Sequence, residues 1–271
     1  MHVVEEIKSS DSITTKYIQE CKHGRLHTVR VERPEKRIIC FSSQLGCGMG
    51  CKFCASSNMG FKYNLTAQQI VDQCMNVIEG LEYRPMLFSA MGMGEPTLNP
   101  HILDAFVELA PMGKVSMSSI GLVPARIVDL YRRLRILGVH LKLQLSVHAP
   151  DDELRRYLLD RRLPSLKDTL DTLGGLSTLI EYNYTLIEGI NDSPEQAVAL
   201  AKLLHTYNGQ VKLNRFNPIK GLGWTGSTQD VVELFKAVLE SNSVKAEVYA
   251  TDGTDIGAAC GQLGLVQETT L

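Results

Sequence analysis

The sequence lacks the features that mark membrane-spanning and exported proteins. None of its apolar runs is long enough to cross a bilayer. Its first residues, Met1-His-Val-Val-Glu-Glu6, become charged at once, where a signal peptide would carry an apolar segment. We therefore expect a cytoplasmic protein with no membrane partner.

An excess of charge of either sign is also missing. The 271 residues carry a formal net charge of −2, and the sequence pI is near 6.4. This balance is not that of a generically basic nucleic-acid binder. With 44% hydrophobic and 21% charged residues, the composition is that of an ordinary globular protein that can bury a sizeable core.

The cysteines do not form the even set of a disulfide framework. They are odd in number and unevenly spread: Cys21, Cys40, Cys47, Cys51, Cys54, Cys74 and Cys260. Disulfides persist in oxidising compartments, whereas a reducing cytoplasm suits free thiols and an oxygen-sensitive metal cluster.

Three of these cysteines share one tight loop, Cys47-Gly-Met-Gly-Cys51-Lys-Phe-Cys54. Soft thiolates select zinc or iron–sulfur clusters, and a closed structural zinc site needs four ligands. No fourth cysteine follows at cluster spacing, so three thiolates would leave one iron of a cluster open. The glycines allow the loop to wrap closely around such a group. The alternatives are a zinc knuckle with a distant fourth ligand, or three unconnected thiols.

From about residue 37 onward, short apolar runs alternate with amphipathic stretches, which predicts βαβ units and a parallel sheet. Six or so such units would close into a barrel or a partial barrel. The expected strands are Arg37–Phe41, Met86–Met91, Lys114–Ser118, Val139–Val147, Leu179–Ile187, Val211–Phe216 and Val244–Ala250. The expected helices are Thr66–Glu79, His101–Ala110, Pro124–Leu137, Asp151–Leu159, Leu166–Leu176, Pro194–Tyr207 and Thr228–Glu240.

Residues 1–36 differ from this pattern because they are charged and lack a helical period, although Leu26–Glu32 alternates like a strand. We expect an N-terminal extension over residues 1–36, packed on a barrel over residues 37–271 that ends in a loop around Cys260.

Residues with functional chemistry follow several of the expected strands. Gly92-Met-Gly-Glu95-Pro96 joins glycines, which let a backbone approach a ligand, to a carboxylate that can accept from an ammonium group. Such a turn is alone usually only a turn. Active sites of parallel α/β folds lie at the carboxyl ends of the strands, so we expect these residues to meet at one rim.

The chain closely resembles the RlmN/Cfr family of radical S-adenosylmethionine (SAM) methyltransferases, which methylate an adenine of large-subunit ribosomal RNA. The resemblance runs from about residue 26 to residue 264. It is carried by Cys40–Cys47, Gly50–Cys54, Met91–Pro96, Ser118–Gly121, Ser146–Pro150, Ile190–Asp192, Arg215–Pro218 and Asp255–Leu263. Asn64-Leu-Thr66, Ser119-Ile-Gly121 and Arg215-Phe-Asn217 look closer to the Cfr-like branch.

The resemblance implies an α/β fold, a radical SAM partial (β/α)6-type barrel, and two cofactors. A 4Fe–4S cluster would be held by Cys47, Cys51 and Cys54, and an external donor of the flavodoxin or ferredoxin type would reduce it. SAM would be bound by Gly94, Glu95, Ser118, Ser146, His148 and Asn217.

It also implies a mechanism with two further thiols. Cys260 would take a methyl group from one SAM, and a 5′-deoxyadenosyl radical from a second SAM would abstract hydrogen from that methyl. The carbon radical would add to an sp² carbon, and Cys40 would release the product by forming a disulfide with Cys260. Where the family has a glutamate thought to take the substrate proton, this chain has His27, which would be the base.

Two departures from the family leave the methyl acceptor open. Residues 1–25 are all that precede the resemblance, where family members carry a small RNA-gripping domain, and Val248–Asp252 is neutral to acidic where the family is basic. Adenine in RNA is the family-typical acceptor, and a small molecule or peptide is the alternative. A non-catalytic iron–sulfur protein is a third reading, but it would need neither Cys40 nor Cys260.

Overall fold

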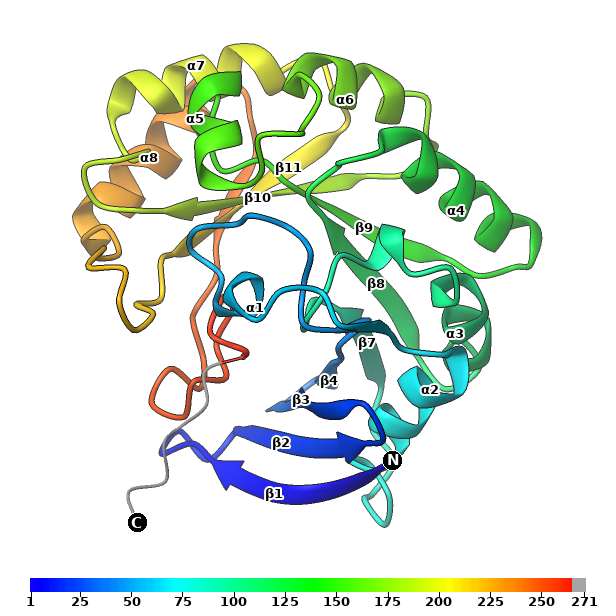
Figure 1. The fold of residues 1–271 in the computed structure, drawn as a ribbon. Coiled ribbons are helices and arrows are strands. Elements are labelled where there is room, and N and C mark those ends of the chain that lie inside the picture. The colour runs from blue at the N-terminus through cyan, green and yellow to red at the C-terminus, as the bar shows by residue number, and fades with distance from the viewer. Residues whose placement is uncertain (265–271) are drawn as a thin grey trace.

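Figure 1 shows the computed structural model of the protein, which describes residues 1–264. Within this part a curved sheet of ten strands runs in the order β1-β2-β3-β4-β7-β8-β9-β10-β11-β12. Its seven neighbouring strands from β4 to β12 are parallel to one another. The α/β partial barrel expected from the sequence is therefore confirmed.

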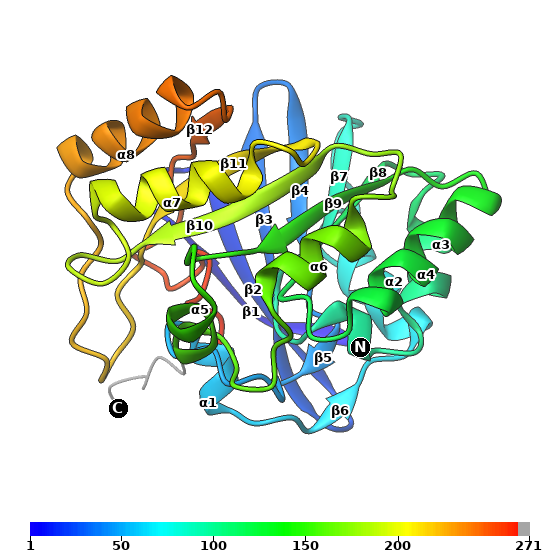
Figure 2. The same cartoon turned by 90° about the horizontal axis from the view of Figure 1, so that it is seen from above.

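The parallel strands are β4 (Lys36–Cys40), β7 (Met86–Ala90), β8 (Lys114–Ser119), β9 (Leu141–Ser146), β10 (Ile180–Leu186), β11 (Gly209–Arg215) and β12 (Ala246–Val248). The main helices cover the convex face of the sheet, as two directions of view show (Figures 1 and 2). They are α2 (Ala67–Met75), α3 (Ile102–Leu109), α4 (Pro124–Ile136), α6 (Leu166–Leu173), α7 (Pro194–Leu204) and α8 (Gln229–Ser241). The short helix α5 (Asp152–Leu158) lies beyond the ends of the strands (Figure 2). The 3₁₀ turn η1 (Pro96–Leu98) precedes α3.

Alternation along the strands decides which face each side chain meets. In β9, Leu141, Leu143 and Leu145 pack in the hydrophobic core, whereas Lys142 and Gln144 line a cavity on the concave side. Successive side chains of a strand point to opposite faces, so the sequence Leu-Lys-Leu-Gln-Leu-Ser separates core from cavity residue by residue. Parallel sheets are usually apolar on both faces. A polar concave face therefore indicates an interior built for ligands.

The N-terminal residues extend the sheet with antiparallel strands, β1 (His2–Lys8), β2 (Thr14–Cys21) and β3 (Gly24–Arg33). The strand expected at Leu26–Glu32 lies within β3. Because β1 is exposed along almost its whole length, its sequence carries no alternation that predicts a strand. The boundary expected at residue 36 falls where β3 pairs with β4. The division of the chain there stays a prediction, and residues 265–271 of the expected barrel lie outside the described part.

The loop of the three spaced cysteines lies between two short elements on the concave side, β5 (Gln44–Leu45) and α1 (Ala55–Asn58). β5 pairs with β6 (Tyr63–Asn64) in a separate two-stranded sheet. Both strands of this small sheet are only two residues long, too short for a sequence pattern to predict.

Polar residues begin the helices as their types predict. Thr66 and Ser193 each form a capping box, with Gln69 and Gln196 respectively, and Thr228 caps α8. α2 ends at Met75, before the expected Glu79, because the chain then continues in turns up to Gly80, whose φ is +72°. No helix among residues 1–264 is long and apolar enough to cross a membrane.

Candidate functional site

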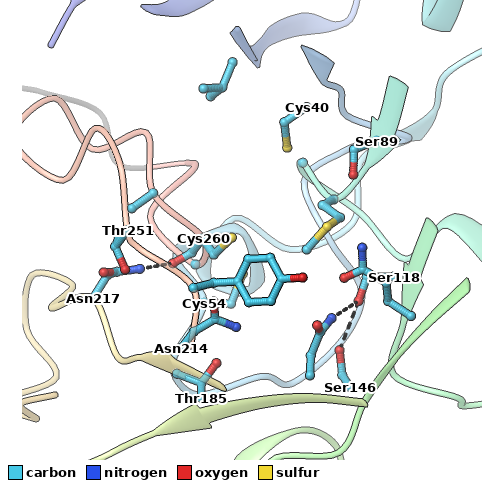
Figure 3. Close-up of a pocket in the computed structure, with 18 of the residues that line it drawn as sticks. Cys40, Cys54, Ser89, Ser118, Ser146, Thr185, Asn214, Asn217, Thr251 and Cys260 are labelled. Atoms are coloured by element: carbon cyan, nitrogen blue, oxygen red, sulfur yellow. Dashed lines mark hydrogen bonds between the residues drawn. The ribbon is translucent and has the colours of Figure 1, made fainter. Parts of the chain in front are cut away.

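A cavity of about 690 Å³ occupies the concave side of the sheet (Figure 3). Its wall is made by strand ends, by the loop of the three cysteines and by the loop that carries Cys260. All the site residues expected from the sequence line it except His27: Cys40, Cys47, Cys51, Cys54, Gly94, Glu95, Ser118, Ser146, His148, Asn217 and Cys260. Segments far apart in the sequence thus meet at one site.

The loop of Cys47, Cys51 and Cys54 is clamped from outside by the segment after α5. Asp160 accepts a hydrogen bond from the backbone N–H of Gly50 at 3.0 Å, and Arg162 donates to the carbonyl of Gly48 at 2.9 Å. Arg162 also pairs with Asp160 at 2.6 Å, and these hydrogen bonds lower the pKa of Asp160 to about 2. Asp160 is therefore charged at neutral pH, and the two residues fix the backbone around the thiols.

The three thiols are suited to bind a cationic, thiophilic group, because their buried surroundings do not stabilise free thiolates. Burial raises the pKa of Cys47 to about 12, and burial with the charges of Cys54 and Cys47 raises the pKa of Cys51 well above its usual value. Bound iron would supply the positive charge that stabilises such thiolates. Which group these thiols hold, an iron–sulfur cluster or zinc, stays a prediction.

Gly94 and Glu95 lie where the turn after β7 meets β5. Gly94 has φ +103°, and a Cβ there would stand 2.7 Å from Gln44 Cβ, so only glycine fits. Glu95 is buried, and its Oε1 accepts from Thr97 and from Ser119 Oγ at 2.7 Å. Its Oε2 accepts from the N–H of Ile120 at 3.0 Å, which leaves a lone pair of that oxygen free. Its contact with a SAM ammonium stays a prediction.

Ser118 and Ser146 lie side by side at the ends of β8 and β9, with their hydroxyl oxygens 3.4 Å apart. Asn183 of β10 donates to Ser118 Oγ at 3.0 Å (Figure 3). The carbonyl oxygens of the Asn183 and Gln144 side chains are buried and have no partner within the described residues. Neither amide was predicted from the sequence, although the alternation of apolar and polar residues in β9 and β10 places both on the concave face.

His148 is held in one orientation. Its φ is +56°, its Nδ1 accepts from the N–H of Thr185 at 2.9 Å, and its ring stands edge-on to Phe53. Burial, assisted by the charge of Arg155, lowers its pKa to about 3. The ring is therefore neutral at physiological pH, which agrees with a binding position and not with acid–base chemistry.

Cys40 and Cys260 approach the cavity from different walls (Figure 3). Cys40 ends β4, and burial, then the neighbouring Cys260, raises its pKa to about 12. Cys260 is exposed, and its carbonyl accepts from Asn217 Nδ2 at 3.0 Å. Its loop is also anchored beside the three cysteines, where the N–H of Ala55 donates to the carbonyl of Gly261 at 2.7 Å.

His27 lies apart from the cavity wall, on β3 beneath the loop of Cys260. It is buried, and its Nδ1 accepts from the N–H of Gly264 at 3.1 Å. Burial, with the charge of Lys16, lowers its pKa to about 4. The side chain is thus neutral, with one ring nitrogen occupied, and its role as a base stays a prediction.

Comparison with known proteins agrees with this geometry. Residues 41–201 match the model of the radical SAM superfamily. The chain is 33% identical to a probable dual-specificity RNA methyltransferase RlmN of Gloeobacter violaceus, over 96% of its own length and 77% of that protein's. It is 35% identical to the RlmN of Syntrophobacter fumaroxidans, over 94% and 78%. A crystal structure of a radical SAM methyltransferase from Sphaerobacter thermophilus superposes with a TM-score of 0.86 at 32% identity, covering 96% and 80% of the two chains.

Proposed function

The chain belongs to the radical SAM superfamily and to its RlmN-type methyltransferases, and from this premise we propose that it methylates an sp² carbon of adenine in RNA through an S-methylcysteine on Cys260. The enzyme is a SAM-dependent radical methyltransferase, and its family implies a 4Fe–4S cluster. Within the family we place it nearer the Cfr-like branch, on Asn64-Leu-Thr66 and Arg215-Phe-Asn217.

One observation carries the proposal. Cys40 and Cys260, which a cluster with three thiolate ligands does not need, line the same cavity as Cys47, Cys51 and Cys54. An iron–sulfur protein that only carried electrons would have no use for two extra thiols at this place. A methyl carrier and a resolving thiol both have to reach the same acceptor, and one cavity allows that.

The cofactors and the two extra thiols have separate roles in the proposed reaction. With the cluster held by Cys47, Cys51 and Cys54, bound SAM would supply the methyl group and the hydrogen-abstracting radical. Cys260 holds the methyl group as a thioether. After its carbon radical adds to the acceptor, the acceptor carbon loses its hydrogen as a proton, and one electron would return to the cluster. The Cys260 sulfur is then linked through one carbon to the acceptor. Cys40 then attacks the Cys260 sulfur. An S–S bond forms, the S–C bond breaks, its electron pair stays on the carbon, and that carbon takes a proton; an external reductant must then reopen the disulfide.

Cys40 must lose its proton before that attack. Its pKa of about 12 leaves it protonated at neutral pH, so its thiol is inert until the loaded site changes its surroundings.

Adenine in RNA is supported by the names of the relatives, which are RNA methyltransferases. A small molecule or peptide is the second candidate. It is favoured by the wall that follows β12, where Tyr249, Ala250 and Thr251 carry no charge and Asp252 pairs with Arg33. Residues 249–252 themselves therefore offer no free cation to a phosphate backbone.

The test uses cluster-reconstituted enzyme under anaerobic conditions, with SAM and a strong reductant. We expect 5′-deoxyadenosine in solution and a methyl group on the Cys260 peptide by mass spectrometry. Cys40→Ala should then trap the acceptor covalently on Cys260, and the mass of the digested adduct identifies it as a nucleotide or another compound.

Cys21→Ala is the matched control, because Cys21 is a half-buried free thiol outside the cavity and should trap nothing. If neither 5′-deoxyadenosine nor methylated Cys260 forms, the proposed chemistry is wrong. A trapped adduct without a nucleotide would reject RNA alone.

A further inference from the structure

Lys212 is the charged side chain of the cavity wall that has no polar partner within the described residues. Every other charged side chain of the wall has a polar partner. Arg33 pairs with Asp252, Lys36 with Glu35 and Lys142 with Glu181, Arg215 donates to the carbonyl of Ser227, and Glu95 accepts from Thr97, Ser119 and Ile120. The Lys212 ammonium contacts the face of the Tyr249 ring, 4.1 Å from the ring centroid.

Neither of the nearest acids forms an ion pair with this ammonium within the described residues. Glu181 Oε1 pairs with Lys142 at 2.8 Å and accepts from Gln210 at 3.2 Å, and Glu181 Oε2 is buried without a partner. Glu247 accepts from Tyr249 at 3.1 Å and pairs with Lys245 at 3.3 Å. Lys212 is half-buried, and a partly desolvated cation without a paired anion is costly, which an aromatic face compensates only in part. The cavity therefore holds a positive charge that a ligand can satisfy.

Two more polar atoms on the same inner face also lack partners. Lys212 is in register with Asn183 of the neighbouring strand, and Gln144 lies one strand further along. The side-chain oxygens Asn183 Oδ1 and Gln144 Oε1 are buried and accept nothing within residues 1–264. One cation beside two acceptors is complementary to an anionic oxygen group that is flanked by O–H or N–H donors.

Lys212 lines the same cavity as the two extra thiols, Cys40 and Cys260. Burial lowers the pKa of Lys212, and the charges of Cys260, Glu181 and Cys40 oppose this shift. An anion on Lys212 would therefore share the cavity with the methyl carrier.

We propose that Lys212, with Gln144 and Asn183, forms a subsite for an anionic oxygen group, a phosphate or a carboxylate, of the methyl acceptor. The identity of the ligand as the acceptor rests on the proposed function, whereas the anion site itself rests on the three side chains. A phosphate beside a ribose hydroxyl and a carboxylate beside an amide N–H both match this wall.

Two alkylating reagents of similar size test the site. Iodoacetate is an anion and iodoacetamide is neutral, and both react with the exposed thiol of Cys260. In reconstituted enzyme without SAM, the ratio of their rates at Cys260 is measured by peptide mass spectrometry and compared with free cysteine. The ratio cancels the thiolate fraction and the accessibility of the loop. We expect iodoacetate to be favoured by about tenfold over the ratio for free cysteine, because an unpaired cation in a cavity concentrates anions locally.

Three variants locate the effect. Lys212→Met should return the ratio to that of free cysteine, and Lys212→Arg should keep most of the preference. Lys245→Met removes a lysine just before the neighbouring strand, where its side chain is 66% exposed, and should change nothing. An unaltered ratio in Lys212→Met, or the same loss in Lys245→Met, would overturn the assignment.

Protection experiments distinguish the two sources of the anion. A phosphate subsite predicts that AMP slows alkylation of Cys260 more than adenosine does, and a carboxylate subsite predicts that N-acetylglycine does so more than its amide. Either difference must vanish in Lys212→Met; absence of both in the native chain rejects the subsite. No step of this experiment transfers a methyl group. Its outcome is therefore independent of whether methylated Cys260 forms, which is the test of the proposed function.

Discussion

At the scale of single residues, two histidines beside the cavity are kept neutral by burial and by nearby cations. Burial and Arg155 lower the pKa of His148 to about 3, and burial and Lys16 lower that of His27 to about 4. In each ring Nδ1 accepts a hydrogen bond from a backbone N–H, that of Thr185 for His148 and that of Gly264 for His27. A neutral ring with Nδ1 as the acceptor carries its proton on Nε2, so each histidine has one fixed tautomer.

His27 gives a pH dependence of stability whose sign can be worked out. Its pKa falls from 6.5 in the unfolded chain to about 4 when folded, so between these values the unfolded chain binds more protons. Stability should therefore fall as pH drops from 6.5 to 4, by up to about 3 kcal/mol from this residue.

His27→Asn keeps an acceptor for Gly264 but does not titrate, and should flatten this part of the slope. Denaturant unfolding of both proteins at pH 7.0, 5.5 and 4.5 measures the difference, in which the contribution of His148 cancels. Equal slopes would show that His27 is not buried as a neutral ring. Normal methyl transfer by the same variant would refute its role as the base.

Site residues that form a motif with a characteristic spacing could be predicted from the sequence. Site residues whose role depends only on their position in the fold could not. Cys47, Cys51 and Cys54 were found because thiolates close in sequence are unusual outside metal sites. Gln144 and Lys212 carry no motif, and their significance depends on which face of a strand they share and on what their neighbours leave unpaired. The apolar residues on either side of each one fix that face, so the alternation within β9 and β11 could have predicted that both side chains face the cavity.

At the scale of elements, the β1–β2 hairpin holds the start of the Cys260 loop. Ser9 Oγ donates to Asp255 at 2.6 Å, and the N–H of Ser10 donates to the same carboxylate at 2.8 Å. The ammonium of Lys16, whose residue is 1% exposed, donates to the carbonyl of Ile256. An N-terminal element thus positions the loop that carries Cys260.

Lys16→Met should loosen this loop while the barrel stays folded. The methionine fills a similar volume but leaves the Ile256 carbonyl without its donor, at a cost of about 1–3 kcal/mol. Hydrogen exchange of peptides from residues 252–264 should become faster, and that of β8 and β9 should not change. Lys8→Met is the control, since Lys8 lies on the same hairpin with its side chain 73% exposed. Unchanged exchange in Lys16→Met would mean that the hairpin does not hold the loop.

The elements that the sequence predicted are those whose residue types repeat with the period of their structure. In β9, β10 and β11 the core residues alternate with more polar ones, and α4 and α8 each bury one face. β1 was missed because both of its faces are largely exposed, and its partner β2 is buried on both faces for most of its length. Pairing with β3 stabilises this hairpin, and such a tertiary contact leaves little trace in a local pattern.

At the scale of the whole molecule, the sheet joins the two ends of the chain around one cavity. Residues 9–27 of the N-terminal strands contact residues 253–264 near the C-terminus, while the strands between them supply the wall. The antiparallel extension and the parallel barrel meet at β3 and β4. This junction decides whether the extension behaves as part of the barrel.

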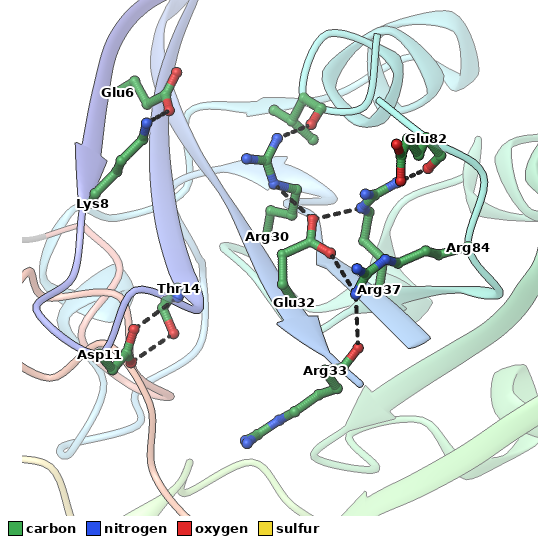
Figure 4. A network of polar contacts seen from close by, with 11 residues as sticks. Glu6, Lys8, Asp11, Thr14, Arg30, Glu32, Arg33, Arg37, Glu82 and Arg84 are labelled. Carbon is green, nitrogen blue, oxygen red and sulfur yellow. Dashed lines mark hydrogen bonds and ion pairs between the residues drawn. The ribbon is translucent and has the colours of Figure 1, made fainter. Parts of the chain in front are cut away.

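A single carboxylate organises that junction. Glu32 pairs with Arg37 at 2.7 Å, with Arg30 at 3.3 Å and with Arg84 at 3.9 Å (Figure 4). Arg37 also donates to the carbonyl of Glu82 at 3.1 Å, which ties in the segment before β7. Removing the negative charge would leave three guanidinium groups to repel one another.

Glu32→Gln should therefore destabilise the whole molecule and not the extension alone. We expect a loss of about 2 kcal/mol, the scale of hydrogen bonds to charged groups, and one cooperative unfolding transition in both proteins. Circular dichroism and the fluorescence of Trp224, which lies beyond β11, should follow the same denaturant curve. Glu35→Gln, whose side chain is 65% exposed, should stay within about 0.5 kcal/mol of the native chain. If Glu32→Gln splits the transition in two, the extension folds as a unit of its own, and the loop of Cys260 would depend on a domain contact instead of a continuous sheet.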